Sequence, residues 1–174
     1  MAILSNDTVF LRAVEPEDLD LLYKWENDSS LWECGDTVNP YSRFAIKAYI
    51  ERTLSEDAVQ IGQLRLMVCL AGSGTAVGMA DLFDIDMING RSGTGIFMAK
   101  EYRGNGFTGM VIKMMEEYSR KVLALHQLYA HIATSNEPCI KCFERNGFVR
   151  SGVLKEWKRC GCGYSDVYIY QKIL

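Results

Sequence analysis

The sequence contains no long uninterrupted hydrophobic run. Its 174 residues hold no stretch of about 18 apolar residues, the length that a membrane-spanning helix needs. Residues 1–7 lack the basic region and apolar core of a secretion signal. Positive charge is not in excess, because 19 Lys and Arg stand against 22 Asp and Glu, a net charge of −3. We therefore expect neither a membrane nor a nucleic acid as a partner.

Repeats, linkers and low-complexity segments are also lacking, and only three prolines interrupt the chain. With 48% hydrophobic and 24% charged residues, the composition is typical of a single globular domain over residues 1–174. The six cysteines are expected to be reduced thiols in the cytoplasm, because no secretion signal precedes them. Composition thus indicates the class of protein and leaves its function open.

Hydrophobic periodicity predicts one strand and two helices in the first third of the chain. The strand covers residues 8–14, and Pro16 then suits the first turn of a helix that continues to Glu26. Residues 27–39 are expected to form a loop. A second helix is predicted after Pro40, carrying Phe44, Ala48, Tyr49 and Ile50.

The remaining chain alternates between strand and helix periods. Strands are predicted at 64–70, 75–87, 91–100, 127–134, 148–154 and 166–173, and helices at 111–122 and 138–146. Asn89-Gly90 is a strong signal for a hairpin turn. This order predicts an α/β (α+β) fold with a mixed, mostly antiparallel central sheet of about seven strands flanked by about four helices.

A glycine loop lies between a predicted strand and a predicted helix. The segment Gly104-Asn105-Gly106-Phe107-Thr108-Gly109 matches G-x-G-x-x-G, whose backbone can fold closely around a phosphate at a helix start. A dinucleotide site would need an acidic residue about 20 positions onward, and Thr134-Ser135-Asn136 at the end of the next strand provides none. A purely structural glycine turn is the other alternative.

Three segments together resemble one enzyme superfamily. Arg103-Gly104-Asn105-Gly106-Phe107-Thr108 is similar to the acetyl-CoA loop of the GNAT acyltransferases, and Asn136 to Phe148 resembles their Asn-x-x-Ala-x-x-x-Tyr-x-x-x-Gly-Phe segment. Leu11-Arg12 with Glu15-Pro16-Glu17-Asp18-Leu19, and Asp84-Ile85-Asp86, resemble the branch of ribosomal-protein and spermidine N-acetyltransferases. The resemblance covers nearly the whole chain, with the segments in the family's order.

The resemblance implies acetyl transfer from acetyl-CoA to a primary amine by direct attack, without a covalent enzyme intermediate. The backbone of Phe97 and Met98 would hold the pantetheine, and Asn136 would bond the same arm. The pyrophosphate would be bound by the loop itself, through Arg103, Gly104, Asn105, Gly106, Phe107, Thr108 and Gly109. Cys139 and Phe143 would lie beside the cofactor.

The general acid is not assigned by the resemblance, because Phe143 stands where the family has its tyrosine. Cys139 lies one helical turn earlier on the same face, and a thiol with a pKa near 8.5 is a candidate donor to the departing thiolate. Packing beside the cofactor is its alternative role. Tyr164, Tyr168 or solvent are further sources of the proton.

The acceptor site is expected to be acidic. Many relatives carry a carboxylate on the strand before the loop, but Gly93 and Gly95 occupy that stretch here. The remaining acids near the expected cleft favour a cationic amine such as a polyamine, and we predict substrate contacts from Glu33, Asp81 and Asp84, with Asp36 and Asp86 as further candidates. Acetylation of a protein N-terminus, as in a ribosomal protein, is the main alternative. A non-catalytic acetyl-CoA sensor is the alternative of another class.

The cysteine spacing raises one competing hypothesis. Cys139-x-x-Cys142 and Cys160-x-Cys162 could in principle form a zinc site, although C-x-C is a poor match to the usual pairs. We expect no metal. Self-association into a homo-oligomer is compatible with the sequence.

Overall fold

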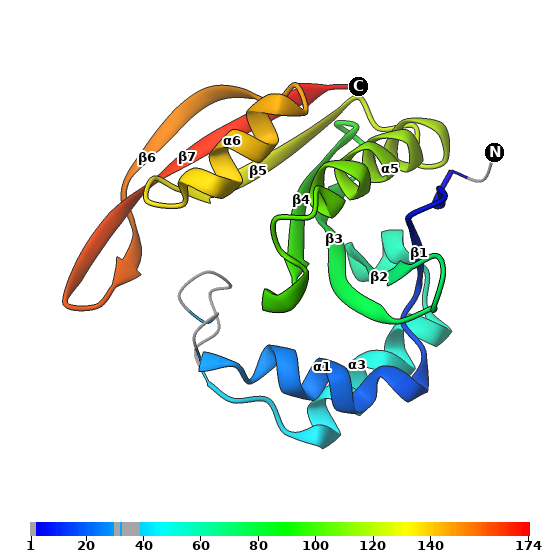
Figure 1. The fold of residues 1–174 in the computed structure, drawn as a ribbon. Coiled ribbons are helices and arrows are strands. Elements are labelled where there is room, and N and C mark those ends of the chain that lie inside the picture. The colour runs from blue at the N-terminus through cyan, green and yellow to red at the C-terminus, as the bar shows by residue number, and fades with distance from the viewer. Residues whose placement is uncertain (1–2, 30–31, 33–38) are drawn as a thin grey trace.

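The computed structural model describes residues 3–29, 32 and 39–174. Its strands form one seven-stranded sheet in the order β1-β2-β3-β4-β5-β7-β6 (Figure 1). All neighbouring strands are antiparallel except β4 and β5, which are parallel. The strands are β1 (Val9–Ala13), β2 (Gln63–Leu70), β3 (Ala76–Asp86), β4 (Arg91–Met98), β5 (Gln127–Ala133), β6 (Val149–Cys160) and β7 (Gly163–Ile173).

Helices cover both faces of this sheet. The α-helices among the described residues are α1 (Leu19–Glu26), α3 (Arg43–Ser55), α4 (Ala58–Ile61), α5 (Phe107–Lys121) and α6 (Glu137–Arg145). Short 3-10 turns, η1 (Pro16–Asp18) and η2 (Lys100–Tyr102), precede α1 and the glycine loop. Helices α5 and α6 lie on one face, and α1 and α3 lie on the other beside the N-terminal half of the sheet (Figure 1).

Strand β2 shows why the two faces are both apolar. Leu66 and Val68 belong to the buried cluster beneath α5 and α6, whereas Met67 and Cys69 belong to the cluster with α1 and α3. Successive side chains of a strand point to opposite faces, so a strand buried on both sides needs an unbroken apolar run. The face of β5 and β7 opposite α5 and α6 has no such helix over it among the described residues.

The sheet opens between β4 and β5. Their parallel pairing runs from Arg91↔Gln127 to Gly93↔Tyr129 and then ends, although β4 continues to Met98 and β5 to Ala133. Beyond Gly93, the edge of β4 that faces β5 therefore has no strand partner in the described sheet. Main-chain N–H and C=O groups along such an edge are available to a ligand that lies in the gap as a strand would.

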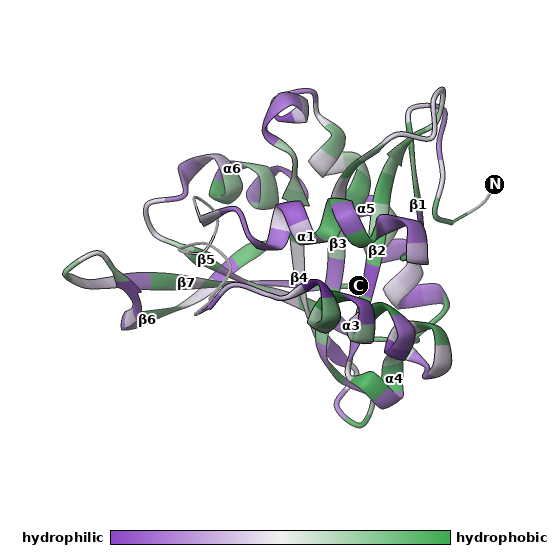
Figure 2. Cartoon of the chain, turned by 90° about the horizontal axis from the view of Figure 1, so that it is seen from below, coloured by the Kyte–Doolittle hydropathy of each residue, from purple (hydrophilic) through white to green (hydrophobic). Residues whose placement is uncertain are grey.

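The last two strands form a long hairpin that extends beyond the body of the molecule (Figure 2). We predicted 148–154 and 166–173, and both limits were too short. An irregularity between Leu154 and Lys158 lets β6 continue past the point where the sequence pattern breaks, with Glu156 in a left-handed conformation. Pairing with β7, rather than local alternation, carries this strand to Cys160.

The predicted fold class is confirmed, with corrections in the N-terminal helices. Phe44 is 81% exposed and Ala48 is also exposed, whereas Ile50, which was among the predicted residues, faces the core together with Ile46. The short helix α4 was not predicted, although Asp57 caps its start and Gly62, in a left-handed conformation, ends it. No helix in the described part of the chain is long and apolar enough to cross a membrane.

Leu82 tests whether the cluster under α5 and α6 carries the stability of the sheet. Its side chain is fully buried there, so Leu82→Ala should lower the free energy of unfolding by about 2–5 kcal/mol. The matched control is Ile88, which is 96% exposed in the β3–β4 turn. Ile88→Ala should change the free energy of unfolding by less than about 0.5 kcal/mol. If urea unfolding showed that Leu82→Ala and Ile88→Ala lose the same free energy of unfolding, this assignment of the core would be wrong.

Candidate active site

The glycine loop leads directly into α5. Gly104 and Gly106 have φ angles of +80° and +78°, a left-handed conformation that other residues rarely adopt. Gly106 is the N-cap of α5, so its N–H and those of Phe107, Thr108 and Gly109 have no acceptor within the helix. A Cβ at Gly104 or Gly106 would meet no atom within 4 Å, which leaves the outer side of the loop open. These features suit a phosphate-bearing ligand.

Side chains around the loop tie it to the end of β4. The Arg103 Nε donates a hydrogen bond to the Met98 carbonyl at 2.9 Å, and the Asn105 amide donates to the Tyr102 carbonyl at 3.2 Å. The terminal nitrogens of Arg103 remain as cationic donors for an anion beside the loop. Gly109, by contrast, faces α6, where a Cβ would lie 3.4 Å from the Asn146 side chain. Its small size therefore serves helix packing as well.

Helix α6 supplies the other predicted cofactor residues. Asn136 is the N-cap of α6, and its Oδ1 accepts a hydrogen bond from the Cys139 backbone at 3.3 Å, which leaves its amide Nδ2 as the donor for a ligand. Cys139 is half-buried at the first turn. Burial raises the pKa of the Cys142 thiol, which makes it a poor source of thiolate.

Phe143 occupies the core. It is 3% exposed, and its ring packs edge-on against Phe148 with the centroids 4.9 Å apart. A phenyl ring in this position cannot donate a proton, so the structure offers no general acid at Phe143. Contact of Phe143 or Cys139 with a cofactor stays a prediction.

An acidic hollow lies on the face of the sheet opposite α5 and α6. It has a volume of about 520 Å³ and is lined by Asp84, Asp86, Arg91, Gln127, Tyr129, His131, Ile169 and Gln171. Sequence analysis found Asp84 and Asp86 but missed the lining from β5 and β7. The signal was present in β5, where Leu128, Ala130 and Ile132 face the core and leave the polar residues between them on the opposite face.

Asp84 is brought into this hollow by a bulge in β3. The β3–β4 register shifts between Phe83 and Asp86, and Asp84 has a φ of +49°. Its Oδ2 accepts a hydrogen bond from the Tyr129 hydroxyl at 3.2 Å. Burial, followed by the Asp84 charge, raises the pKa of the Tyr129 phenol, so this donor stays neutral. Asp86, in contrast, pairs with Arg91 at 3.2 Å.

Phe83 packs over β4 at Gly93, in the stretch where the sequence has glycines instead of the carboxylate that many relatives carry. A Cβ at Gly93 would lie 2.2 Å from the Phe83 ring, which therefore covers the strand at that point. The same ring packs edge-on against Tyr129 with the centroids 6.0 Å apart. An aromatic surface thus takes the place of a carboxylate beside the opening between β4 and β5.

Asp81 is less accessible than we expected for a substrate contact. Both of its carboxylate oxygens accept hydrogen bonds from Arg65, at 2.8 and 3.0 Å, and its side chain is 20% exposed. The Trp32 indole donates a hydrogen bond to the Glu26 carbonyl at 3.0 Å. Glu33 and Asp36 lie outside the described residues. Substrate contacts from Glu33, Asp81 and Asp84 stay predictions.

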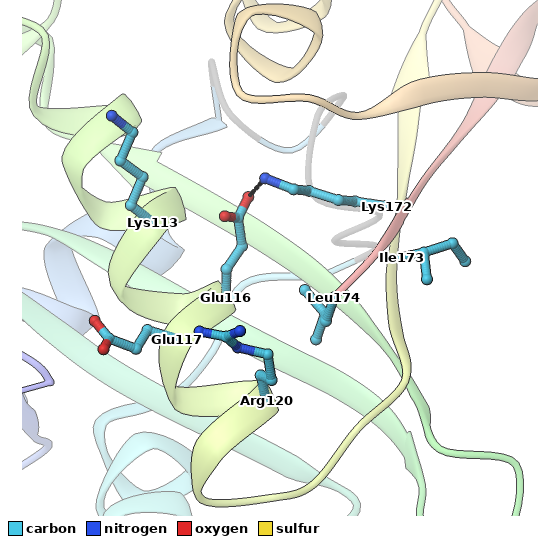
Figure 3. Close-up of a pocket in the computed structure, with 7 residues that line it drawn as sticks. All are labelled: Lys113, Glu116, Glu117, Arg120, Lys172, Ile173 and Leu174. Carbon is cyan, nitrogen blue, oxygen red and sulfur yellow. Dashed lines mark hydrogen bonds and ion pairs between the residues drawn. The ribbon is translucent and has the colours of Figure 1, made fainter.

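A second hollow, of about 370 Å³, lies between α5 and the end of β7 (Figure 3). Its two carboxylates are engaged, because Glu116 pairs with Lys172 at 2.6 Å and Glu117 pairs with Lys121. It is also remote from the glycine loop, since its residues belong to the middle and end of α5. Its carboxylates are therefore not free to bind a cationic amine.

The cysteine pairs do not converge. Cys139 and Cys142 lie on α6, whereas Cys160 and Cys162 are exposed at the tip of the β6–β7 hairpin. Within the described ranges, no group of three or more His, Cys, Asp and Glu residues could hold a metal ion. The zinc hypothesis therefore has no structural support in that part of the chain.

A glycine loop at a helix start, beside a sheet that opens between two parallel strands, is the arrangement that the resemblance to acyl-CoA-dependent acyltransferases implied. The family model for the acetyltransferase (GNAT) domain matches residues 8–149, and the chain belongs to this family. It is thus an acetyl-CoA-dependent acyltransferase, as the loop and the Asn136–Phe148 segment predicted.

Relatives of the same branch match almost the whole chain. The spermidine N(1)-acetyltransferase of Vibrio cholerae is 28% identical over 170 residues, covering 95% of each chain. Its crystal structure in complex with CoA and spermine has a TM-score of 0.87 at 26% identity and covers 97% of this chain and 96% of that one. YdaF of Bacillus subtilis, which carries the provisional name ribosomal N-acetyltransferase, is 23% identical and covers 95% of this chain and 91% of its own.

Gly106 provides a direct test of the loop. Gly106→Ala places a Cβ where a phosphate would approach the backbone, and CoA affinity measured by calorimetry should fall by about tenfold or more. Gly62→Ala is the matched control, because Gly62 has a φ of +76°, equally open surroundings and a position far from the loop at the end of α4. Both variants should lose about 1–2 kcal/mol of stability. Unchanged CoA affinity in Gly106→Ala would refute the loop assignment.

Proposed function

We propose that this enzyme acetylates a small cationic polyamine, using acetyl-CoA bound between β4 and β5. The observation that carries the proposal is the acidic hollow beside that opening, in which Asp84 is bonded to a neutral hydroxyl. A carboxylate without a cationic partner keeps its full charge for an incoming ammonium group. The related spermidine N-acetyltransferases support the same substrate class.

The position of the hollow fits the direction of transfer. Tyr129 lines it and also forms the last parallel pair with Gly93 before the strands separate. Cofactor phosphates at the glycine loop and an amine on the opposite face of the sheet would approach the opening from two sides. The anionic cofactor phosphates would bind at the N-terminus of α5, and the cationic amine would bind at Asp84. Charge would therefore direct the two substrates to opposite sides of the opening.

The reaction requires a neutral amine. Its lone pair attacks the acetyl carbon, a C–N bond forms, the C–S bond breaks, and the sulfur leaves as a thiolate. Main-chain N–H groups on the unpaired edge of β4, around Phe97 and Met98, would stabilise the negative charge that develops on the acetyl oxygen. The amine loses one proton and the thiolate gains one. Protonation of the thiolate by Cys139 is retained as a proposal, with solvent as the other source.

The first experiment measures thiol release from acetyl-CoA with spermidine, spermine, an aminoglycoside and a short peptide with a free N-terminus. We expect saturable release with the polyamines. Release with the peptide alone would favour acetylation of a protein N-terminus, and tight CoA binding without release would favour a sensor. Either result would contradict the proposed substrate.

Asp84 is the residue on which amine recognition should depend. Asp84→Asn removes the charge, and asparagine tolerates the left-handed backbone, so the fold should persist. We expect the KM for spermidine to rise about tenfold to a hundredfold, because a hydrogen bond to a charged group contributes about 1.5–3 kcal/mol. Asp7→Asn, an exposed carboxylate on the N-terminal segment, controls for net charge and should leave KM unchanged. Equal effects of both variants would contradict a specific contact.

A further inference from the structure

Arg65 is a buried cation that the acetyl transfer described above does not use. It lies opposite Asp81 in the β2–β3 register, and its Nε and Nη2 donate to the two Asp81 oxygens at 2.8 and 3.0 Å. Its Nη1 donates to Glu26, the last residue of α1. The three side chains are only 17%, 20% and 19% exposed, so this ion pair network is largely shielded from water.

One guanidinium therefore joins four elements. It connects β2 to β3 through Asp81 and to the end of α1 through Glu26, and it lies 5.5 Å from the ring centre of Tyr49 on α3. Burial raises the pKa of the Tyr49 phenol, which keeps this neighbour neutral. Only a planar, forked cation can hold two carboxylates in this way; a lysine ammonium is a point charge on a flexible stem.

The network lies next to the unpaired segment of β4. Trp25 precedes Glu26 on α1, and its ring lies 5.1 Å from that of Phe97. Phe97 is beyond Gly93, where β4 has lost its β5 neighbour. Asp81 pairs in register with Gly95 on the same segment. The two carboxylates that Arg65 holds thus belong to the two elements that support β4 at the acyl site.

We infer that Arg65 is a positioning residue for acetyl transfer: by holding Glu26 and Asp81 together, it fixes Trp25 against Phe97 and so sets the unpaired edge of β4. The inference rests on acetyl transfer at this edge, as proposed above. It does not depend on which amine is the acceptor. Arg65 acts through its partners and has no contact with the reacting atoms.

The first test is Arg65→Lys, which keeps the charge and removes the fork. We expect kcat to fall about tenfold to a hundredfold, because small displacements of a reacting geometry have effects of this size. CoA affinity should change by less than about twofold, since the phosphate loop lies on a separate element. Arg12→Lys is the matched control: Arg12 forms a bidentate pair with Asp18, at 2.7 and 2.8 Å, beside the start of α1. It should lower Tm without lowering kcat.

A triple variant separates positioning from stability. Replacing Arg65, Glu26 and Asp81 together (Arg65→Met, Glu26→Gln, Asp81→Asn) removes every charge of the network, so no unpaired buried charge remains and Tm should recover. The proposal expects kcat to stay low after Tm has recovered while the KM for the amine stays unchanged. A raised KM with a normal kcat would instead assign Asp81 to substrate binding and overturn the positioning role. Recovery of kcat together with Tm would overturn it, because Arg65 would then serve stability alone.

A spectroscopic readout requires no acceptor amine. In a background with Trp32→Phe and Trp157→Phe, Trp25 is the remaining tryptophan of three. Adding Arg65→Lys should shift its emission to longer wavelength as its contact with Phe97 loosens, and adding Arg12→Lys should not. An unchanged emission would overturn the proposal even if polyamines prove not to be substrates. Failure of the polyamine assay alone, with the shift observed, would leave Arg65 as the positioning residue and refute only the substrate.

Discussion

Strands β4 and β5 are parallel neighbours over the pairs from Arg91↔Gln127 to Gly93↔Tyr129, and the arrangement of the site depends on how soon this pairing ends. An edge that a sheet leaves unpaired exposes a row of main-chain donors and acceptors. Helix α5 covers one face of β4, and Trp25 of α1 packs against Phe97 on the other. The edge is therefore open to a ligand yet held rigidly, which is what transfer between two bound substrates requires.

The two faces of this opening favour ligands of opposite charge. On one side, the N–H groups at the start of α5 and the Arg103 guanidinium favour an anion. On the other, Asp84 in its hollow favours a cation. The net charge of the chain is only −3. The opposite charge preferences of the two faces therefore come from the placement of a few groups rather than from the overall charge.

Local signals made the fold and the cofactor loop predictable, and tertiary contacts made the acceptor site harder to predict. The Asn89-Gly90 turn, the apolar stripe of α5 and the left-handed glycines each impose their structure over a few residues. The bulge that turns Asp84 inward depends instead on pairing with β4, and the requirement for glycine at position 93 depends on the Phe83 ring packed over it. Likewise, the sequence shows Arg65 only as a charged residue on an alternating strand. Its role as a link depends on Glu26, which is far away in sequence and lies beside it only in the folded protein.

The proposed contact with Asp84 would favour a polyamine over an amine with a single nitrogen. An alkylammonium has a pKa near 10, as lysine does, and a neighbouring carboxylate raises it further. A nitrogen bound to Asp84 would therefore be held as a cation and could not be the nucleophile. A substrate with several nitrogens resolves this conflict, because one can be bound as ammonium while another, beside the apolar Phe83 and Phe97 surfaces, loses its proton and attacks. Because Phe143 has no proton to donate, the departing thiolate would take its proton from Cys139 or from solvent.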